Sequence, residues 1–451
     1  MEIREYLDNN LENLKADLAR LIKIPSVSGE KDGKYPFGKE CGNVLDEFLK
    51  IAEERGFSAK NYDYYAGSAD LFSEGEAELG ILAHLDVVPV TEKNWTVPPF
   101  EMTEKDGRLY GRGAEDDKGP LLAAMWAMKA VKECGCKLKG NVRLIAGCSE
   151  ETGSELDIEE YCKREKMPSK VFTPDAEFPI ITTEKGMLRF TFGGKVNTGT
   201  ILSLEGGTVV NAVPSEVKAV LRGRIPLPKN ENVTAYFEEG NTVIVCKGKS
   251  AHASTPAQGI NAFTELLAYL IPVGEMTEED RRLIDGLLKL FPKGETDGKA
   301  LDLAVKDKSG ETTCVFSIVD LHDGQLTAKA DMRFPVSLNK AKCTENIKAA
   351  IERAGFSLLD IRGSEPHSVD EKGDFVQALL KAYSDVTGEP AFCKAIGGGT
   401  YVHNIEGGVA FGMEIDGQDN HIHGDDEWVG VDALLMAAEI YAKAIVGVLS
   451  C

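Results

Sequence analysis

The chain has 451 residues, more than one ordinary hydrophobic core accommodates, so we expect two domains. Lys and Arg number 51 and Asp and Glu number 73, which gives a formal net charge of −22. An acidic surface of this kind repels phosphate backbones and anionic lipids, so nucleic-acid and membrane partners are not expected.

The N-terminal segment has the pattern of an amphipathic helix, because apolar residues recur at three- and four-residue steps from Ile3 to Leu21. It lacks the basic, apolar and small-residue regions of a signal peptide. The ten cysteines are scattered without a CxxC pair, which favours reduced thiols and a cytoplasmic location. The apolar segment 433–449 contains Glu439 and Lys443, and we expect a buried amphipathic helix there rather than a membrane span.

Up to about residue 187, short apolar runs alternate with helical stretches. LGILAHLDVV and NVRLIAGCS have the composition of buried strands, and GPLLAAMWAMKAVKECG between them has that of a helix. This alternation predicts an α/β domain with a mostly parallel sheet covered by helices.

The pattern changes between about residues 188 and 390. Several segments there alternate apolar and polar residues with the period of strands, and two helices are expected near 260–272 and 340–354. After about residue 390 the α/β pattern returns. The expected organisation is a first domain of residues 1–187 and 391–451, interrupted by an inserted α+β domain of residues 188–390.

His, Asp and Glu residues gather in short segments that follow the predicted strands. They are His84 and Asp86 in ILAHLDVVP, Asp116 in GRGAEDDKGP, Glu150 and Glu151 in GCSEETGS, Asp175 in TPDAEFP, and His423 in HIHGDDE. Two imidazoles and several carboxylates without thiolates suit one or two divalent cations such as zinc, manganese or cobalt. Two metals that share a carboxylate would activate a water molecule and polarise a carbonyl, which is the apparatus of amide hydrolysis.

Each segment by itself also has a purely structural explanation. His84 could be a core histidine beside a turn aspartate, and the Glu150–Glu151 pair could begin an exposed helix, since carboxylates favour helix N-termini. Their positions at strand ends favour a joint site, because open α/β sheets place their sites at the carboxyl ends of the strands.

Taken together, the segments resemble those of the co-catalytic dinuclear metallopeptidase family that contains carboxypeptidase G, aminoacylase and acetylornithine deacetylase. The resemblance extends from LIKIPSVSG near the start of the chain to HGDDE near its end. DDKGP, PDAEFP, the long insert and GGGTY are most similar to the bacterial dipeptidase V branch, whose members are Xaa-His dipeptidases of the carnosinase type.

The resemblance implies a site for two divalent ions, Zn²⁺ or Mn²⁺ with Co²⁺ as an alternative. It implies that His84, Asp116 and Asp175 hold one ion. Asp116 would bridge to the second ion, which Glu151 and His423 complete. The first domain is thus expected to be the catalytic, metal-binding domain.

The resemblance also implies roles beside the ions. Asp86 would accept a hydrogen bond from His84 and fix its tautomer. Glu150 would be the general base that takes a proton from the water and returns it to the leaving amine. The Asp116–Asp117 bond matches a cis peptide position of the family.

In the inserted domain, His252 lies in KGKSAHASTPAQGINA and is either a surface-loop histidine or, as the resemblance implies, a donor to the oxyanion of the intermediate. Asn211 and Arg333 match substrate-contacting positions, and a guanidinium such as that of Arg333 would suit the carboxylate of a dipeptide. The insert would then act as a substrate-binding lid. A glycine-rich turn, either a structural turn or a source of N–H groups for the same carboxylate, comprises Gly398, Gly399 and Thr400, preceded by Gly397.

The expected function is therefore that of a metal-dependent dipeptidase that hydrolyses the amide bond of unblocked dipeptides, with a small peptide as its only expected partner. One alternative is an N-acyl amino-acid deacylase of the acetylornithine deacetylase or succinyl-diaminopimelate desuccinylase type. Another is a non-catalytic peptide-binding protein on the same fold, which would have no need of Glu150. A long insert that can supply His252 within one chain favours a dipeptidase over a deacylase and is compatible with a monomer.

Overall fold

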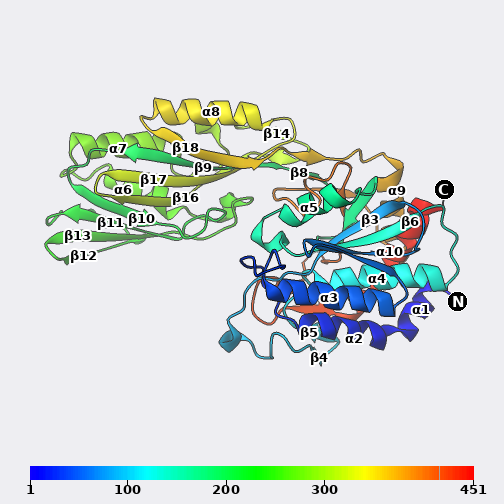
Figure 1. Ribbon diagram of the computed structural model, residues 1–451. Helices are drawn as coiled ribbons and strands as arrows, with labels where there is room; N and C mark the ends of the chain where they lie inside the picture. Colours follow the sequence, from blue (N-terminus) through cyan, green and yellow to red (C-terminus); the bar gives the residue numbers. More distant parts are fainter. Residues whose placement is uncertain (416, 451) are drawn as a thin grey trace. The chain divides into compact units, whose positions relative to one another are not determined.

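The structure is a computed structural model that describes residues 1–415 and 417–450. The chain folds into two compact units, each with its own hydrophobic core (Figure 1). Unit 1 consists of Met1–Thr182, Ser368–Lys394 and Thr400–Cys451, and unit 2 of Thr183–His367 and Ala395–Gly399.

The main sheet of the chain belongs largely to unit 1 and has parallel strands at its centre. In spatial order its strands are β1 (Ser58–Tyr62), β2 (Ala66–Asp70), β6 (Asn141–Gly147), β3 (Ala77–His84), β7 (Lys170–Thr173), β21 (Val409–Ala410), β8 (Ile180–Glu184) and β19 (His367–Ser368), and β20 (Cys393–Ile396) also pairs with β8. The pairs β6–β3, β3–β7 and β7–β21 are parallel, whereas β1–β2, β2–β6 and β21–β8 are antiparallel. The predicted α/β architecture is confirmed, with antiparallel pairs added towards the edges.

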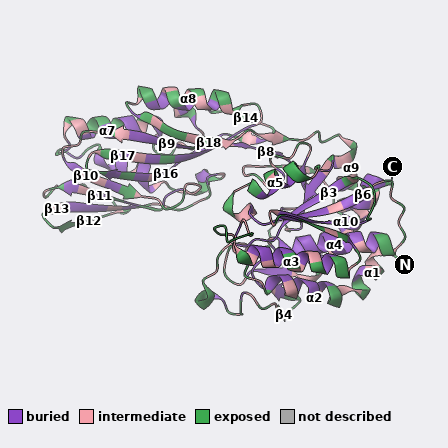
Figure 2. Cartoon of the chain, viewed as in Figure 1, coloured by how far each residue is buried: buried purple, intermediate pink, exposed green. Residues whose placement is uncertain are grey.

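Helices bury the central strands, so these strands are apolar along most of their length rather than alternating. The helices of unit 1 are α1 (Ile3–Asn9), α2 (Leu11–Ile22), α3 (Lys39–Glu54), α4 (Lys118–Glu133), α5 (Leu156–Arg164), α9 (Asp374–Thr387) and α10 (Val431–Leu449). The last six residues of β3 are buried, and α4 is buried along nearly its whole length (Figure 2). Helix α10 packs against α4 and α9 as the buried helix that the sequence predicts.

The N-terminal helix differs from the sequence prediction, because it is divided into α1 and α2 at Asn10. The side-chain amide of Asn10 donates to the carbonyl of Tyr6, which lies four residues earlier. Asn side chains that bond to the backbone in this way compete with the helix, and the backbone of Asn10 leaves the helical conformation.

A small three-stranded sheet in unit 1 brings two distant segments together. Strand β22 (Trp428–Gly430) pairs with β5 (Arg108–Tyr110), which pairs with β4 (Thr103–Lys105). The pairing between Trp428 and Tyr110 therefore holds the end of the HGDDE segment beside the start of the loop that leads to α4.

Unit 2 is an α+β structure with an antiparallel sheet, as predicted. In spatial order its strands are β12 (Val233–Glu238), β13 (Asn241–Lys247), β11 (Glu216–Arg222), β10 (Ile201–Gly206), β16 (Thr313–His322), β17 (Gln325–Phe334), β9 (Gly186–Lys195) and β18 (Ser357–Ser364). Helices α6 (Ala262–Leu270), α7 (Glu278–Leu290) and α8 (Lys340–Arg353) share one hydrophobic core with these strands, and β14 (Lys306–Asp307) pairs with β15 (Gly310–Glu311). Helices α6 and α8 occupy the two predicted helical segments, whereas α7 was not predicted.

The unit boundaries differ from the predicted domain boundaries at both ends of the insert. Residues 183–187 and 395–399 are predicted in the first domain but belong to unit 2. Residues 368–390 are predicted in the insert, but this segment forms part of unit 1. Its helix α9 buries the apolar side chains of Val376, Leu379 and Ala382 in the unit 1 core, against α10. The apolar face of α9 must be buried against another element, and the sequence pattern does not indicate that this element is α10.

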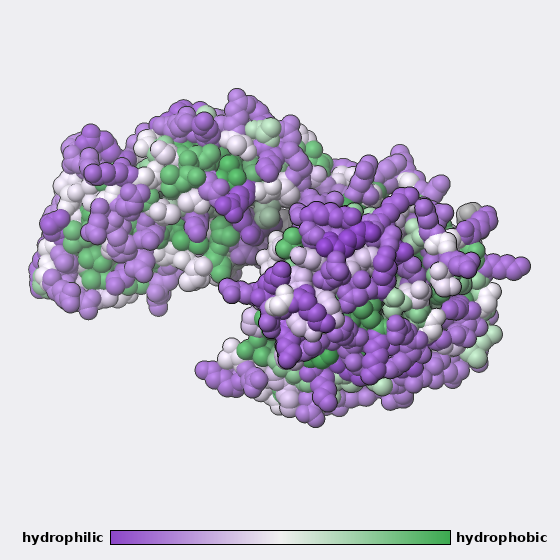
Figure 3. Space-filling model, in the orientation of Figure 1, coloured by the Kyte–Doolittle hydropathy of each residue, from purple (hydrophilic) through white to green (hydrophobic). Residues whose placement is uncertain are grey.

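Polar side chains cover most of the face of unit 1 that Figure 3 presents, as the acidic composition leads one to expect. None of the helices in the described part of the chain has the length and hydropathy to span a bilayer.

The packing of α9 can be tested with one buried and one exposed leucine. Replacing Leu379, which is fully buried, with Ala should lower the free energy of unfolding by about 2–5 kcal/mol, because the cavity left behind cannot collapse completely. The same replacement at Leu359, which is 52% exposed, should change it by less than about 0.5 kcal/mol. Denaturant unfolding measures both values, and equal effects would contradict this packing.

Candidate metal centre

The segments with His, Asp and Glu residues meet at one edge of the unit 1 sheet. His84 is the last residue of β3, Asp175 follows the end of β7 by two residues, and Glu150 and Glu151 lie in the short 3-10 helix Glu150–Thr152 after β6. Because β6, β3 and β7 are parallel neighbours, their carboxyl ends lie at the same edge. Asp116 joins them from the loop before α4.

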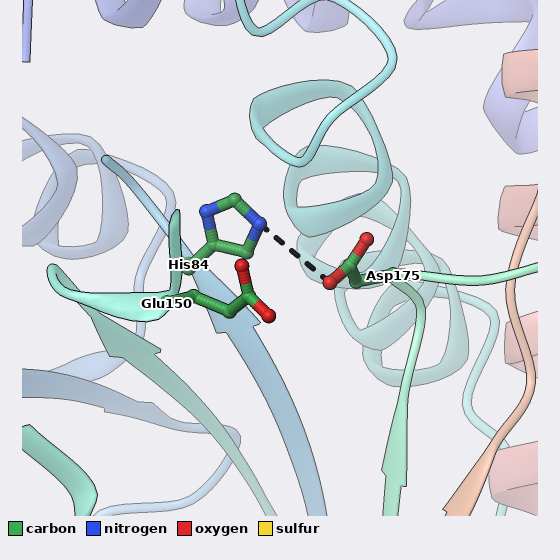
Figure 4. A group of neighbouring side chains, drawn as sticks. All are labelled: His84, Glu150 and Asp175. Atoms are coloured by element: carbon green, nitrogen blue, oxygen red, sulfur yellow. Dashed lines mark ion pairs between the residues drawn. The ribbon is translucent and has the colours of Figure 1, made fainter. Parts of the chain in front are cut away.

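A first group of possible metal ligands consists of His84, Glu150 and Asp175, whose ligand atoms lie within 4.8 Å of one another. Figure 4 shows the side chains of Glu150 and Asp175 pointing toward the imidazole of His84. The distance from His84 Nε2 to Asp175 Oδ2 is 3.6 Å.

A second group consists of Asp116, Glu151 and His423, whose ligand atoms also lie within 4.8 Å of one another. His423 Nε2 lies 2.9 Å from Asp116 Oδ2 and 3.0 Å from Glu151 Oε2. The other oxygen of Asp116, Oδ1, lies 3.0 Å from His84 Nε2. Asp116 therefore offers one oxygen to each imidazole and links the two groups.

The buried ring of His84 has one nitrogen that the fold leaves without a hydrogen bond. Nδ1 lies 3.0 Å from the main-chain oxygen of Asp86, but Nε2 makes no hydrogen bond to any described residue although carboxylates surround it. A nitrogen in this position is suited to coordinate a cation. Burial lowers the pKa of His84, but the carboxylates of Asp116, Asp175 and Asp86 outweigh burial and raise it well above its ordinary value.

The remaining groups also show the effect of crowded negative charge. The contacts of His423 with Asp116 and Glu151 raise its pKa to about 10. Burial, together with the charges of Asp175, Asp116 and Glu151, raises the pKa of Glu150 to about 8. A centre with more carboxylates than imidazoles is stabilised by added positive charge, so the residues fit divalent cations.

Asp86 contacts His84 as expected, but through its main-chain oxygen rather than mainly through its carboxylate. The main-chain oxygen of Asp86 is the atom at hydrogen-bond distance from the ring, whereas its Oδ1 lies 3.5 Å away. The carboxylate instead accepts hydrogen bonds from the backbone N–H groups of Glu150, at 3.3 Å, and Glu151, at 3.1 Å. Asp86 therefore holds the segment with these two glutamates against the end of β3.

The residues expected to contact substrate lie in unit 2, apart from Thr400, which belongs to unit 1. Nδ1 of His252 accepts a hydrogen bond from the backbone N–H of Ser254 at 3.2 Å, and the carbonyl of Asn211 accepts one from Ala253. Burial, followed by the charge of Arg333, lowers the pKa of His252. A ring that stays neutral near pH 7 keeps its other nitrogen, Nε2, as a donor.

Arg333 is arranged differently from the expectation that its guanidinium grips a substrate carboxylate with two hydrogen bonds. Its Nε and Nη2 donate to the two oxygens of Asp331 at 2.6 and 3.1 Å, and Nη1 donates to the carbonyl of Gly397 at 3.1 Å. The planar fork is therefore already occupied by Asp331, and Arg333 holds the turn that begins at Gly397 and continues through Gly398 and Gly399.

A model of peptidase family M20/M25/M40 matches residues 80–446. The chain belongs to this family. It is therefore a hydrolase that acts on peptide bonds, and the family resemblance of the sequence is confirmed.

Individual relatives match over nearly the whole chain. The putative dipeptidase YtjP of Bacillus subtilis (strain 168) is 34% identical over 460 residues and covers 96% of each chain. A beta-Ala-Xaa dipeptidase of Lactobacillus delbrueckii subsp. lactis is 33% identical over 473 residues, with 99% of this chain and 98% of the relative covered. The solved structure of human carnosine dipeptidase 1 has a TM-score of 0.61 at 17% identity over 100% of this chain and 99% of that one, which shows a shared fold.

Further residues of this peptidase shape the centre although the sequence did not single them out. Asp157 Oδ2 accepts hydrogen bonds from the backbone N–H groups of Cys148 and Ser149, both at 2.9 Å, and from the hydroxyl of Tyr401. The ring of Tyr401 lies edge-on to His84, with 6.0 Å between the ring centroids. Asp157 lies in the first turn of α5, where acidic residues are common in any helix, so its sequence context does not single it out.

Two more carboxylates complete the surroundings. Asp117 forms the cis peptide bond with Asp116 that the resemblance implies, and it accepts a hydrogen bond from the backbone N–H of His84 at 3.0 Å. Burial and the charges of Asp175 and Asp116 raise the pKa of Glu414 to about 7, so this side chain adds to the acidity of the centre.

Cation binding should release protons from the metal-free protein. Below pH 10 His423 carries a proton that its carboxylate neighbours stabilise, and a coordinated imidazole must lose it. Adding Zn²⁺ or Mn²⁺ at pH 8 should therefore release protons, and the His423→Ala variant should release fewer. The release from His423 should diminish as the pH rises through 10. Calorimetry in two buffers of different ionisation enthalpy measures it, and binding at pH 8 without proton release would contradict this electrostatic account.

Proposed function

We propose that this peptidase is a metal-dependent dipeptidase that cleaves unblocked dipeptides with a water molecule activated by two divalent ions. The observation that carries the proposal is the pair of ligand groups that share Asp116, whose two oxygens face His84 and His423. When bound, the ions would supply the positive charge that polarises a carbonyl and lowers the pKa of water.

The proposed ligands divide between the two ions. His84 and Asp175 would hold one ion, Glu151 and His423 would hold the other, and Asp116 would contribute one oxygen to each. Imidazole and carboxylate ligands accept several metals, so we propose Zn²⁺ or Mn²⁺, with Co²⁺ as an alternative.

Glu150 is the proposed general base. Its carboxyl group lies beside His84 and Asp175, and in the metal-free protein burial and neighbouring carboxylates raise its pKa to about 8. Cations at the ligand groups would counter the carboxylates and favour the ionised form that a base requires. Glu150 would take a proton from the attacking water and deliver it to the nitrogen of the leaving amine.

Dipeptides are the proposed substrates because relatives that share a third of the sequence over nearly its whole length carry the name dipeptidase. Contacts of substrate with His252, Asn211 and Arg333 stay predictions from the sequence, as do contacts with Gly398, Gly399 and Thr400. Since Nε and Nη2 of Arg333 donate to Asp331 and Nη1 donates to Gly397, this arginine would contact a peptide carboxylate through the remaining N–H of Nη1 or Nη2. The monomeric state and the cytoplasmic location also stay predictions.

The roles of Glu150 and the ligands should separate on mutation. Glu150→Gln should retain both ions and substrate affinity yet lose at least about 10²-fold in kcat, because general acid–base catalysis is worth that much or more. Glu151→Gln should lose affinity for one ion instead. Elemental analysis and steady-state kinetics after chelation and reconstitution measure both. Near-native kcat in Glu150→Gln would exclude Glu150 as the base, and full activity in protein shown to be metal-free would exclude the metal mechanism.

A substrate panel tests the proposed specificity. Unblocked dipeptides should be cleaved with the highest kcat/KM, and the same dipeptides with an amidated C-terminus should be cleaved poorly because they lack the carboxylate. Longer peptides and N-acetyl amino acids serve as comparisons. Preferential hydrolysis of acetylornithine or another N-acyl amino acid would identify a deacylase instead.

A further inference from the structure

Glu427 lies outside the proposed ligand set but connects two of the three segments that carry the second ligand group, those of Asp116 and His423. It follows His423 by four residues and is completely buried next to the start of β22. In the segment HGDDE, Glu427 differs from the two preceding aspartates only in its longer side chain.

The carboxylate of Glu427 accepts four hydrogen bonds from the loop that leads to Asp116. Oε2 accepts from Nη1 of Arg112 at 2.6 Å and from the backbone N–H of Gly113 at 3.0 Å. Oε1 accepts from the backbone N–H groups of Glu115 at 2.9 Å and Asp116 at 3.1 Å. The last of these donors is the backbone of the bridging aspartate itself.

The shape of the loop depends on this carboxylate. Gly113 has a φ of 85°, in the left-handed region that favours glycine, and this turn directs N–H groups from both sides of it toward one point. Converging N–H groups of this kind form an anion-binding concavity, and here the anion is a side chain of the other segment.

Further contacts tie the same two segments together. Nη2 of Arg112 donates to the carbonyl of Gly424, directly after His423, at 2.8 Å, and the backbone N–H of Gly111 donates to the carbonyl of Glu427 at 3.0 Å. The segments of Asp116 and His423 are thus joined through Glu427 and Arg112, and the distance between the two ligands depends on this junction.

A role in stability alone does not account for the arrangement. The attraction within a buried ion pair such as Glu427–Arg112 often does not exceed the free energy of removing both charges from water. A well-packed apolar pair is often at least as stable. Burial and the charge of Asp116 both raise the pKa of Glu427, so the carboxylate lies where negative charge is already concentrated. The carboxylate of Glu427 fixes the orientation of three backbone N–H groups of the loop.

We propose that Glu427 is a positioning residue that sets the geometry of Asp116 relative to His423 and thereby maintains the affinity for the ion these two share. The inference rests on the proposed two-ion centre. Partners that orient metal ligands typically affect metal affinity by about 10–100-fold, and this is the effect expected for Glu427.

Glu427→Gln is the test variant, because the amide keeps the shape but replaces one acceptor oxygen with a donor and removes the charge. Competition with a chromophoric chelator should show an affinity for one ion weakened by about 10–100-fold. The affinity for the other ion should change by less than about 3-fold, so the gel-filtered protein should hold one ion instead of two. Raising the concentration of free metal should restore kcat, while KM for a dipeptide stays unchanged.

Asp17→Asn is the matched control. Asp17 is a fully buried carboxylate of the same unit and accepts hydrogen bonds from Nε and Nη2 of Arg55 and from Nε1 of Trp126. Its replacement should lower the melting temperature and leave both metal affinities native. Glu427→Asp keeps the charge with a shorter reach, and its affinity for the shared ion should lie between those of the native chain and Glu427→Gln.

The outcomes separate this inference from the proposed function. Fewer than two bound ions in the native protein would overturn the two-ion centre itself. Two ions in the native protein and native affinity for both in folded Glu427→Gln would overturn only the role of Glu427, as would a melting-temperature change without a change in affinity. If Glu427→Gln does not fold, native metal affinity in Glu427→Asp overturns the proposal.

Discussion

Carboxylates converge at the carboxyl edge of the unit 1 sheet, where burial removes much of the water that would screen their repulsion. Asp116, Asp175, Glu150 and Glu151 approach only two imidazoles there. This excess of negative charge explains the direction of the main pKa shifts, since both histidines hold protons more firmly and Glu150 becomes harder to ionise. It also makes the centre a good site for divalent cations, which replace the protons.

The fold keeps these groups together by placing a second layer of buried carboxylates behind them. Asp86 binds the backbone of Glu150 and Glu151, Asp117 binds that of His84, and Glu427 binds that of Asp116. Each bond joins a ligand-bearing segment to a buried carboxylate of unit 1 through backbone N–H groups. These hydrogen bonds fix the backbone of the ligand-bearing segments although the carboxylates of the ligands repel one another.

The two compact units carry different parts of the expected chemistry. The possible metal ligands and Glu150 belong to unit 1, and His252, Asn211 and Arg333 belong to unit 2. Within unit 2 the Arg333–Asp331 pair and the Ser254–His252 contact orient two of the expected substrate residues before any peptide is bound. Preorganisation of this kind lowers the entropy cost of binding, because fewer side chains must be ordered when substrate arrives.

The α/β and α+β character of the units is readable from the sequence, because strand and helix periods are local. The candidate ligands are readable too, because His84, Glu150, Glu151 and Asp175 lie at the ends of apolar strands and Asp116 and His423 lie in segments with recognisable motifs. The sequence did not predict the break at Asn10, which depends on a hydrogen bond from the Asn10 side chain to the backbone of the preceding turn. It also did not place α9 in unit 1, because that position depends on the packing of the apolar face of α9 against α10. The roles of Asp157 and Glu427 were equally hidden. Both roles depend on the folded chain, because these carboxylates are buried against donors that the sequence does not place beside them: Tyr401 for Asp157, and the loop of residues 112–116 for Glu427.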